Sequence, residues 1–211
     1  MCGILGFLNS SCQNEPSITQ TMGLRMVNSI AHRGPDDRGM WQDNGVFVGM
    51  RRLSIIDLVT GQQPIFNEDG SCCIVCNGEV YNYLTLRQQL IAKGHKFKTQ
   101  SDTEVIIHAY EEWGCDCVQH FRGMFAFAVY NQAKNELFLA RDPFGIKPLF
   151  YAELSQGFVF ASELRALLKL PYFPRQINWE AFNLYIRLNY IPAPWTIWAQ
   201  AKRLEPVIGY L

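Results

Sequence analysis

Paired strand-like segments joined by short turns constrain the fold most strongly. Residues 124–130 and 136–140 are separated by five mostly polar residues, and residues 149–153 and 158–161 by four. Turns of this length join neighbouring antiparallel strands in hairpins. Parallel strands need connections of a dozen residues or more. We therefore expect antiparallel sheets.

The remaining periodic segments fall into groups and do not alternate strictly. Strands are expected at residues 4–8, 46–50, 54–58 and 72–76, and helices at residues 18–32, 83–93, 103–113, 163–169 and 179–188. Runs of strands with helices grouped between them are typical of the α+β class. No βαβ rhythm and no internal repeat accompanies them.

Composition excludes several function classes. The chain has 211 residues, with 19 Lys and Arg balanced by 19 Asp and Glu, so no basic field is available for nucleic acid or an anionic membrane. Its longest apolar run, residues 124–130, is far shorter than the ~20 residues of a membrane span. The N-terminus lacks the basic segment of a secretion signal. We expect a cytoplasmic protein with no nucleic-acid or membrane partner.

The chain has seven cysteines, and those with metal-like spacing are best interpreted as small core side chains. An odd number without a secretion signal argues against a disulfide framework. Cys73 and Cys76 have a metal-like spacing, but side chains three apart on a strand point to opposite faces. Cys115 and Cys117 follow a glycine in a predicted loop. We expect no metal site.

The last 41 residues differ in character from the rest of the chain. They contain five of its ten prolines and many aromatic residues. We expect one domain at residues 2–170 and a connector with one helix at residues 171–211. The apolar surface of this connector needs something to cover it.

Cys2 is the first candidate for chemistry. A small residue at position two normally allows removal of the initiator Met1. The thiol and the freed α-amine of Cys2 then form a nucleophile and base on one residue, because an α-amine titrates at about pH 8. The alternative is a Met-Cys start that arose by chance.

Asn77 and Gly78 follow the strand expected at residues 72–76. An Asn amide beside a Gly backbone N–H supplies two donors that can converge on one oxygen, as an oxyanion hole requires. The alternative is a turn, since Asn-Gly is a common hairpin pair. A predicted helix, and not a strand, follows this pair.

Arg52 and Asp102 are candidates for binding charged groups. An Arg can pair with a carboxylate through two hydrogen bonds, and an Asp can hold an ammonium group. The alternative for Asp102 is helix capping, either by itself or by Ser101. Together with a thiol and an oxyanion hole, these residues describe a site for an amino acid with a reactive acyl side chain.

Eight motifs in order give the chain a family resemblance. They are Cys-Gly-Ile at residues 2–4, His-Arg-Gly-Pro-Asp at 32–36, Arg-Leu-Ser-Ile-Ile-Asp at 52–57, Gly-Gln-Gln-Pro-Ile at 61–65, Asn-Gly-Glu-Val-Tyr-Asn at 77–82, Ser-Asp-Thr-Glu at 101–104, Arg-Asp-Pro-Phe-Gly at 141–145 and Ala-Ser-Glu at 161–163. This series closely resembles the glutaminase half of glutamine-hydrolysing asparagine synthetases, which are class II glutamine amidotransferases. Other class II amidotransferases read differently at residues 52–57 and 77–82.

The resemblance implies the N-terminal nucleophile hydrolase fold, a four-layer αββα sandwich of two antiparallel sheets. It also implies hydrolysis of L-glutamine to glutamate and ammonia. Its site residues, transferred position by position, are Cys2 as nucleophile, Asn77 and Gly78 as oxyanion hole, Arg52 for the α-carboxylate, Glu79 and Asp102 for the α-ammonium, and Ile55 for a backbone contact. Residues 32–36 are expected to form a structural turn with no chemical step.

The resemblance implies no cofactor for the glutaminase reaction. ATP and Mg²⁺ are needed only where a synthetase domain or subunit forms asparagine from aspartate. The phosphate loop of that domain is absent from this sequence, and residues 203–210 depart from the family pattern. We expect a synthetase partner and consider a homodimer. The alternatives are a catalytically silent scaffold that binds a partner through residues 171–211, and a hydrolase acting on another amide.

Overall fold

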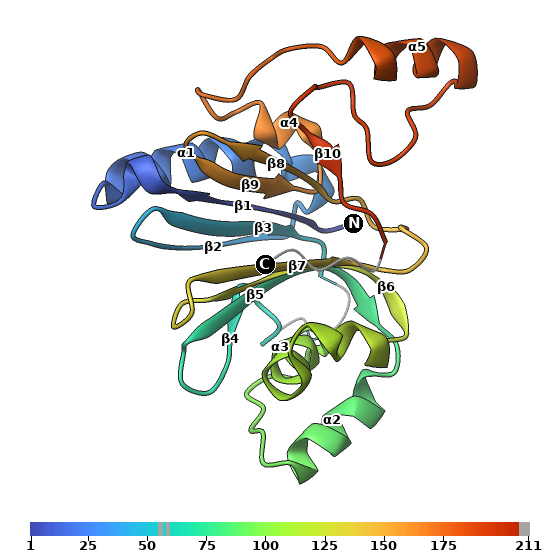
Figure 1. Ribbon diagram of the computed structural model, residues 1–211. Coiled ribbons are helices and arrows are strands. Elements are labelled where there is room, and N and C mark those ends of the chain that lie inside the picture. Colours follow the sequence, from blue (N-terminus) through green and yellow to red (C-terminus); the bar gives the residue numbers. More distant parts are fainter. Residues whose placement is uncertain (55–56, 58–59, 207–211) are drawn as a thin grey trace.

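A computed structural model describes residues 1–54, 57 and 60–206. Two antiparallel sheets lie face to face between helical layers (Figure 1). The first sheet has the order β10-β8-β9-β1-β3-β2. Its strands are β1 (Gly3–Asn9), β2 (Asp37–Asp43), β3 (Val46–Arg52), β8 (Phe150–Leu154), β9 (Gly157–Ala161) and β10 (Lys202–Arg203).

The second sheet has the order β4-β5-β6-β7. Its strands are β4 (Ile65–Phe66), β5 (Cys72–Val80), β6 (Gly123–Asn131) and β7 (Glu136–Arg141). The α-helices are α1 (Pro16–Ser29), α2 (Tyr83–Ala92), α3 (Asp102–Trp113), α4 (Leu164–Leu167) and α5 (Trp179–Leu188). Three 3₁₀ segments cover Ser10–Cys12, Ala31–Arg33 and Gly114–His120.

Three buried apolar clusters separate these four layers. One lies between the two sheets and includes Ile4 and Val75. A second packs α1 and α4 against the first sheet through residues such as Leu5. A third packs α2 and α3 against the second sheet and includes Ile74. Neighbouring residues of one strand therefore face different cores, which confirms the predicted αββα sandwich.

The predicted hairpins are confirmed. β6 pairs with β7 and β8 with β9, both antiparallel. Cys73 faces the core between the sheets and Cys76 faces the helical layer, so they lie on opposite faces as predicted. No disulfide joins the cysteines of the described residues. No described helix has the length and apolarity needed to cross a bilayer.

The prediction of a strand at residues 54–58 is wrong at the two positions that the structure describes. Ser54 and Asp57 lie outside any strand. Asp57 has a left-handed φ of +49°, which interrupts an extended backbone. The other three positions of that segment lie outside the described residues.

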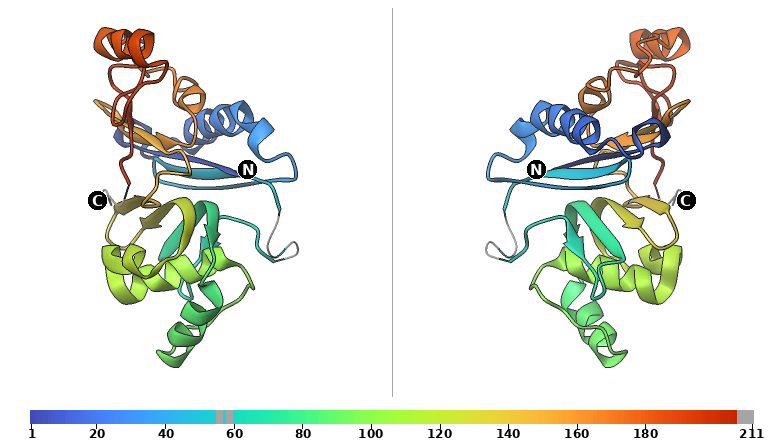
Figure 2. Two further views of the ribbon diagram at one scale, coloured as in Figure 1. Left: turned by 90° about the vertical axis from the view of Figure 1, so that its right-hand side faces the viewer. Right: turned by 90° about the vertical axis from the view of Figure 1, so that its left-hand side faces the viewer.

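The C-terminal segment both packs on the domain and extends away from it. β10 pairs with β8, and Phe173 and Leu204 are buried. α5 lies at the end of the molecule opposite α2 (Figure 2). Exposed apolar side chains on this helix are Trp179, Phe182, Tyr185, Ile186 and Leu188. The domain boundary expected at residue 170 stays a prediction.

Candidate active site

Six of the seven predicted site residues line one cavity of about 410 Å³. They come from different elements: Cys2 precedes β1, Arg52 ends β3, Asn77, Gly78 and Glu79 lie in β5, and Asp102 begins α3. The seventh, Ile55, lies outside the described residues. The sandwich therefore gathers the nucleophile, the donors and the charged side chains in one place.

The thiol of Cys2 lies beside the backbone of Leu53. The Leu53 N–H donates to Sγ over 3.3 Å, and Sγ lies 3.5 Å from the Leu53 carbonyl oxygen. Arg33 Nε donates to the Cys2 carbonyl over 2.8 Å, and Arg33 also pairs with Glu163 at 3.1 Å. Both neighbours fix the position of the nucleophile.

Arg33 belongs to the motif at residues 32–36, for which only a structural turn was expected. The turn is present, because a 3₁₀ segment ends at Arg33 and the Gly34 N–H donates to the Ala31 carbonyl oxygen. The expectation missed the hydrogen bond from Arg33 to the nucleophilic residue. Sequence spacing gave no sign that positions 31 residues apart meet here.

Asn77 and Gly78 lie inside β5 and form no turn, so the turn alternative is wrong. Asn77 pairs with Ala126 and Gly78 with Phe125 in register with β6. Asn77 is 1% exposed, and its Nδ2 has no hydrogen-bond partner among the described residues. A buried donor without a partner costs free energy, and Asn77 is one of the residues that line the cavity with the thiol.

Gly78 is required by its surroundings. Its φ is +151°, and a Cβ added there would lie 2.1 Å from the Met124 carbonyl oxygen. Only glycine lets β5 and β6 approach so closely at this point. A side chain at this position of the cavity wall would therefore push β5 away from β6.

Asp102 is a buried carboxylate at the start of α3. The helix cap is Ser101, which accepts a hydrogen bond from the Thr103 N–H, so Asp102 is not the cap. Its Oδ2 accepts from the Val80 N–H over 2.8 Å. Burial, and then the neighbouring Glu79 carboxylate, raise the pKa of Asp102 above its ordinary value. A cation bound between these two carboxylates would relieve both effects.

Arg52 brings a positive charge to the same cavity. It is 5% exposed, and its Nη2 donates to the Asp57 carbonyl over 2.6 Å. This bond fixes the guanidinium, and a fixed guanidinium can pair with a carboxylate. The cavity thus presents a cationic group and two anionic groups to one ligand.

Several other polar residues of this cavity, among them Gln63 and Lys147, were not predicted from the sequence. Gln63 accepts from the Cys76 N–H over 2.6 Å and donates to Thr103 Oγ1 over 3.2 Å, so it joins β5 to α3. Lys147 is 7% exposed. Gln63 lies within a recognised motif and Lys147 two residues beyond another, but neither pattern indicated a position in the site.

The sequence matches the glutamine amidotransferase domain family over residues 1–209. It is 48% identical over 180 residues to a glutamine-hydrolysing asparagine synthetase of Bacillus subtilis, which covers 85% of this chain and 24% of that protein. A second synthetase of this organism is 41% identical over 98% of this chain and 32% of its own length. The chain therefore spans about a quarter to a third of these relatives.

The structure of a glutamine phosphoribosylpyrophosphate amidotransferase from B. subtilis resembles this one. The TM-score is 0.62 at 26% identity, covering 79% of this chain and 43% of that one. Fold and site together define an amidotransferase of the N-terminal nucleophile hydrolase class. The chain belongs to the glutamine amidotransferase family, and it corresponds to the N-terminal part of glutamine-hydrolysing asparagine synthetases.

Proposed function

We propose that this chain hydrolyses L-glutamine to glutamate and ammonia through a thioester on Cys2. The observation that carries the proposal is the buried, unpartnered Nδ2 of Asn77, a residue that lines the cavity with the thiol. A buried donor that lacks a partner in the free protein is available to a negative oxygen that forms during the reaction.

The reaction begins after Met1 is removed. The free α-amine of Cys2 takes the thiol proton, and the thiolate attacks the side-chain amide carbon of glutamine. Asn77 Nδ2 and the Gly78 N–H stabilise the resulting oxyanion. The C–N bond breaks as the ammonium of Cys2 returns the proton to nitrogen, which leaves as ammonia. Water then attacks the thioester, giving glutamate and the restored thiol.

The charged groups bind the amino-acid end of the substrate. Arg52 pairs with the α-carboxylate, and Asp102 with Glu79 holds the α-ammonium, since all three line the cavity beside the nucleophile. Such a set selects a free amino acid over a blocked amide, because blocking leaves buried charges without partners.

Ammonia released here supplies asparagine formation by the remaining part of a longer protein or by a separate synthetase subunit. The chain matches only the N-terminal part of asparagine synthetases, which supports this proposal. ATP and Mg²⁺ belong to that other part. The exposed apolar side of α5 supports a second function, in which the chain binds its partner without catalysis.

Steady-state hydrolysis of a substrate panel tests the proposed substrate. We expect L-glutamine to exceed glutamine derivatives blocked at the amine or the carboxylate by a factor of at least ~100 in kcat/KM. Arg52→Gln should reduce this preference at the carboxylate alone. Faster hydrolysis of blocked amides would assign the chain to another amidohydrolase, and no hydrolysis by Met1-free protein would favour the scaffold.

A further inference from the structure

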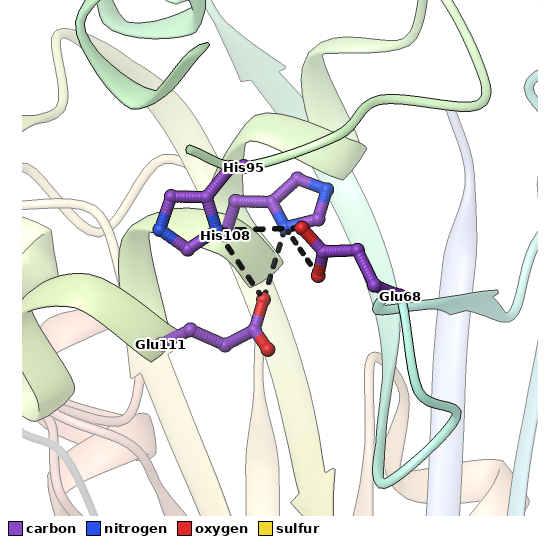
Figure 3. A group of neighbouring side chains, drawn as sticks. All are labelled: Glu68, His95, His108 and Glu111. Atoms are coloured by element: carbon purple, nitrogen blue, oxygen red, sulfur yellow. Dashed lines mark hydrogen bonds and ion pairs between the residues drawn. The ribbon is translucent and has the colours of Figure 1, made fainter. Parts of the chain in front are cut away.

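A second group of ionisable side chains lies on the helical side of the second sheet, apart from the residues that line the active-site cavity. Glu68, His95, His108 and Glu111 converge there (Figure 3). His108 Nδ1 is 2.9 Å from a Glu111 oxygen and 3.4 Å from a Glu68 oxygen. His95 Nδ1 is 3.6 Å from Glu68 and 3.9 Å from Glu111.

The four side chains come from three separate segments. Glu68 lies after β4, His95 lies between α2 and α3, and His108 and Glu111 lie on α3. The two residues of α3 are three positions apart, a spacing that places side chains on one helix face. This convergence arises from the tertiary fold, which explains why no sequence spacing suggested it.

Neighbouring polar groups surround the four side chains on the side away from their point of convergence. Asn67 Nδ2 donates to the second oxygen of Glu111 over 2.7 Å, and the Lys96 N–H donates to Glu68 over 2.9 Å. Behind the rings, His108 Nε2 lies 3.8 Å from Glu104, and His95 Nε2 lies 3.6 Å from Glu112. Carboxylates behind imidazoles and donors behind carboxylates are the arrangement that orients metal ligands.

His108 supplies an independent observation. Its side chain is 1% exposed, and Nε2 has no hydrogen-bond partner among the described residues. Coordination through Nδ1 requires the proton on Nε2, where it faces the buried Glu104 carboxylate. A metal on Nδ1 therefore leaves the Nε2–H directed toward the Glu104 carboxylate, 3.8 Å away.

The local charge also favours a cation. With neutral imidazoles, the carboxylates of Glu68, Glu104, Glu111 and Glu112 surround the two rings. Among the described residues, Lys93 is the lysine that forms an ion pair with this group of carboxylates. Its Nζ lies 2.5 Å from a Glu112 oxygen. A divalent ion would offset the remaining negative charge.

We propose that Glu68, His95, His108 and Glu111 form a site for a divalent transition metal of the zinc type. Two imidazole nitrogens with two carboxylate oxygens suit zinc, whereas Mg²⁺ and Ca²⁺ prefer oxygen ligands. Tetrahedral bonds of 2.0–2.1 Å place ligand atoms about 3.3 Å apart. The two Nδ1 atoms lie 2.9 and 3.9 Å from one oxygen of Glu111, and 3.4 and 3.6 Å from two different oxygens of Glu68. With one ligand atom from each residue, the four atoms all lie within 4.8 Å of one another, a spread that small side-chain movements bring to tetrahedral spacing.

The proposed metal joins the segment after β4 and the α2–α3 connection to α3. This helix begins at Asp102 in the active-site cavity and carries His108 less than two turns later. Metal binding should therefore restrain the helix that carries the ammonium-binding carboxylate. The structural role and the binding itself can be measured without any assay of glutamine hydrolysis.

Titration of the metal-stripped chain with Zn²⁺ and Co²⁺ tests the site. We expect one equivalent of Zn²⁺ to bind and to raise Tm. Co²⁺ should give visible absorption of a tetrahedral site without the thiolate-to-cobalt band in the near ultraviolet. That band, or binding abolished by Cys115→Ser, would place the metal on cysteine and overturn the proposal.

Matched variants locate the ligands. Glu111→Gln keeps the shape of its side chain, and His95→Gln changes a side chain that is partly exposed, so both variants should fold. Each should weaken Zn²⁺ binding by more than the ~10–100-fold typical of outer groups. His120→Gln and Glu153→Gln alter residues outside the cluster and should leave binding unchanged. Equal affinity in all four variants, or a zinc-soaked crystal without anomalous density between the four side chains, would refute the site.

Discussion

At the scale of single residues, substitution of Asn77 distinguishes a catalytic role of its side chain from a structural one. Its amide nitrogen is buried without a partner, so the folded chain gains nothing from that donor. We expect Asn77→Ala to lower kcat by about 10²–10³-fold, as removal of one oxyanion-hole donor does. KM should change much less, because the oxyanion exists only after attack.

Initial rates over a range of glutamine concentrations, with Asn183→Ala as a control, check this expectation. Asn183 is exposed on α5, far along the chain from the cavity residues. A raised KM with an unchanged kcat in Asn77→Ala would show that the amide binds ground-state substrate and does not stabilise the oxyanion.

The protonation of Asp102 should make kcat/KM depend on pH. Burial first and Glu79 second raise the pKa of Asp102, and only the ionised form holds an ammonium group. The value of kcat/KM should therefore fall with decreasing pH, with an apparent midpoint above the ordinary Asp value of about 3.9.

The raised pKa of Asp102 also determines how this residue's contribution to stability changes with pH. A carboxyl group whose pKa is raised by folding stabilises the protein most at low pH, and this contribution is lost as pH rises through the folded pKa. Asp102→Asn should therefore keep its free energy of unfolding at pH 7 while glutamine binding is lost. Urea unfolding beside kcat/KM, with Asp116→Asn as control, measures both. A large loss of stability would show that the charge is structural.

At the scale of elements, the β2–β3 hairpin shows what sequence patterns miss. The turn contains Asn44 and Gly45, both with positive φ, as a type I′ turn requires. The turn interpretation was instead weighed for Asn77 and Gly78, which lie within a strand. β2 was missed because its residues alternate weakly between partly buried and exposed positions.

Other misses have related physical causes. β4 and β10 are two-residue strands, too short to carry a period. By contrast, the predicted bounds of α5 agree with the structure, because a capping Asn178 and a helical pattern define them locally. Residues of the site were found from motifs, whereas the contact of Arg33 with Cys2 and the proposed metal site depend on contacts between distant segments.

Substitutions at two glycines test the turn of the β2–β3 hairpin. Gly45 and Gly70 have φ of +84° and +78°, but an added Cβ meets the Asn9 carbonyl oxygen at 2.5 Å only at Gly45. Gly70→Ala should cost about 1 kcal/mol for the left-handed backbone. Gly45→Ala should cost about 1–3 kcal/mol more, because the β1–β3 edge must shift. Equal losses in urea unfolding would show that the steric contact at Gly45 is relieved without cost.

At the scale of the whole molecule, α5 leaves an apolar surface uncovered. Trp179, Tyr185 and Ile186 are 66%, 49% and 63% exposed. The chain spans about a quarter to a third of the relatives it matches. Apolar patches of this kind mark interaction surfaces.

The exposed apolar surface of α5 should bind a hydrophobic dye, and charged substitutions on α5 should abolish this binding. The isolated chain should bind a hydrophobic fluorescent dye, and Trp179→Glu with Ile186→Glu should remove most of that signal with little change in the free energy of unfolding. Ile18→Glu changes an exposed apolar residue of α1 and should have little effect. Unchanged dye fluorescence in the α5 variant would place the accessible apolar surface elsewhere.

Intact mass together with glutamate release tests the central claim most directly. We predict that the purified chain lacks one Met, exposing the α-amine of Cys2, and turns over L-glutamine. Cys2→Ala should abolish turnover, whereas Cys115→Ser, which changes another accessible thiol, should keep it. Turnover that persists in Cys2→Ala, or Met1-free protein that releases no glutamate, would contradict the account.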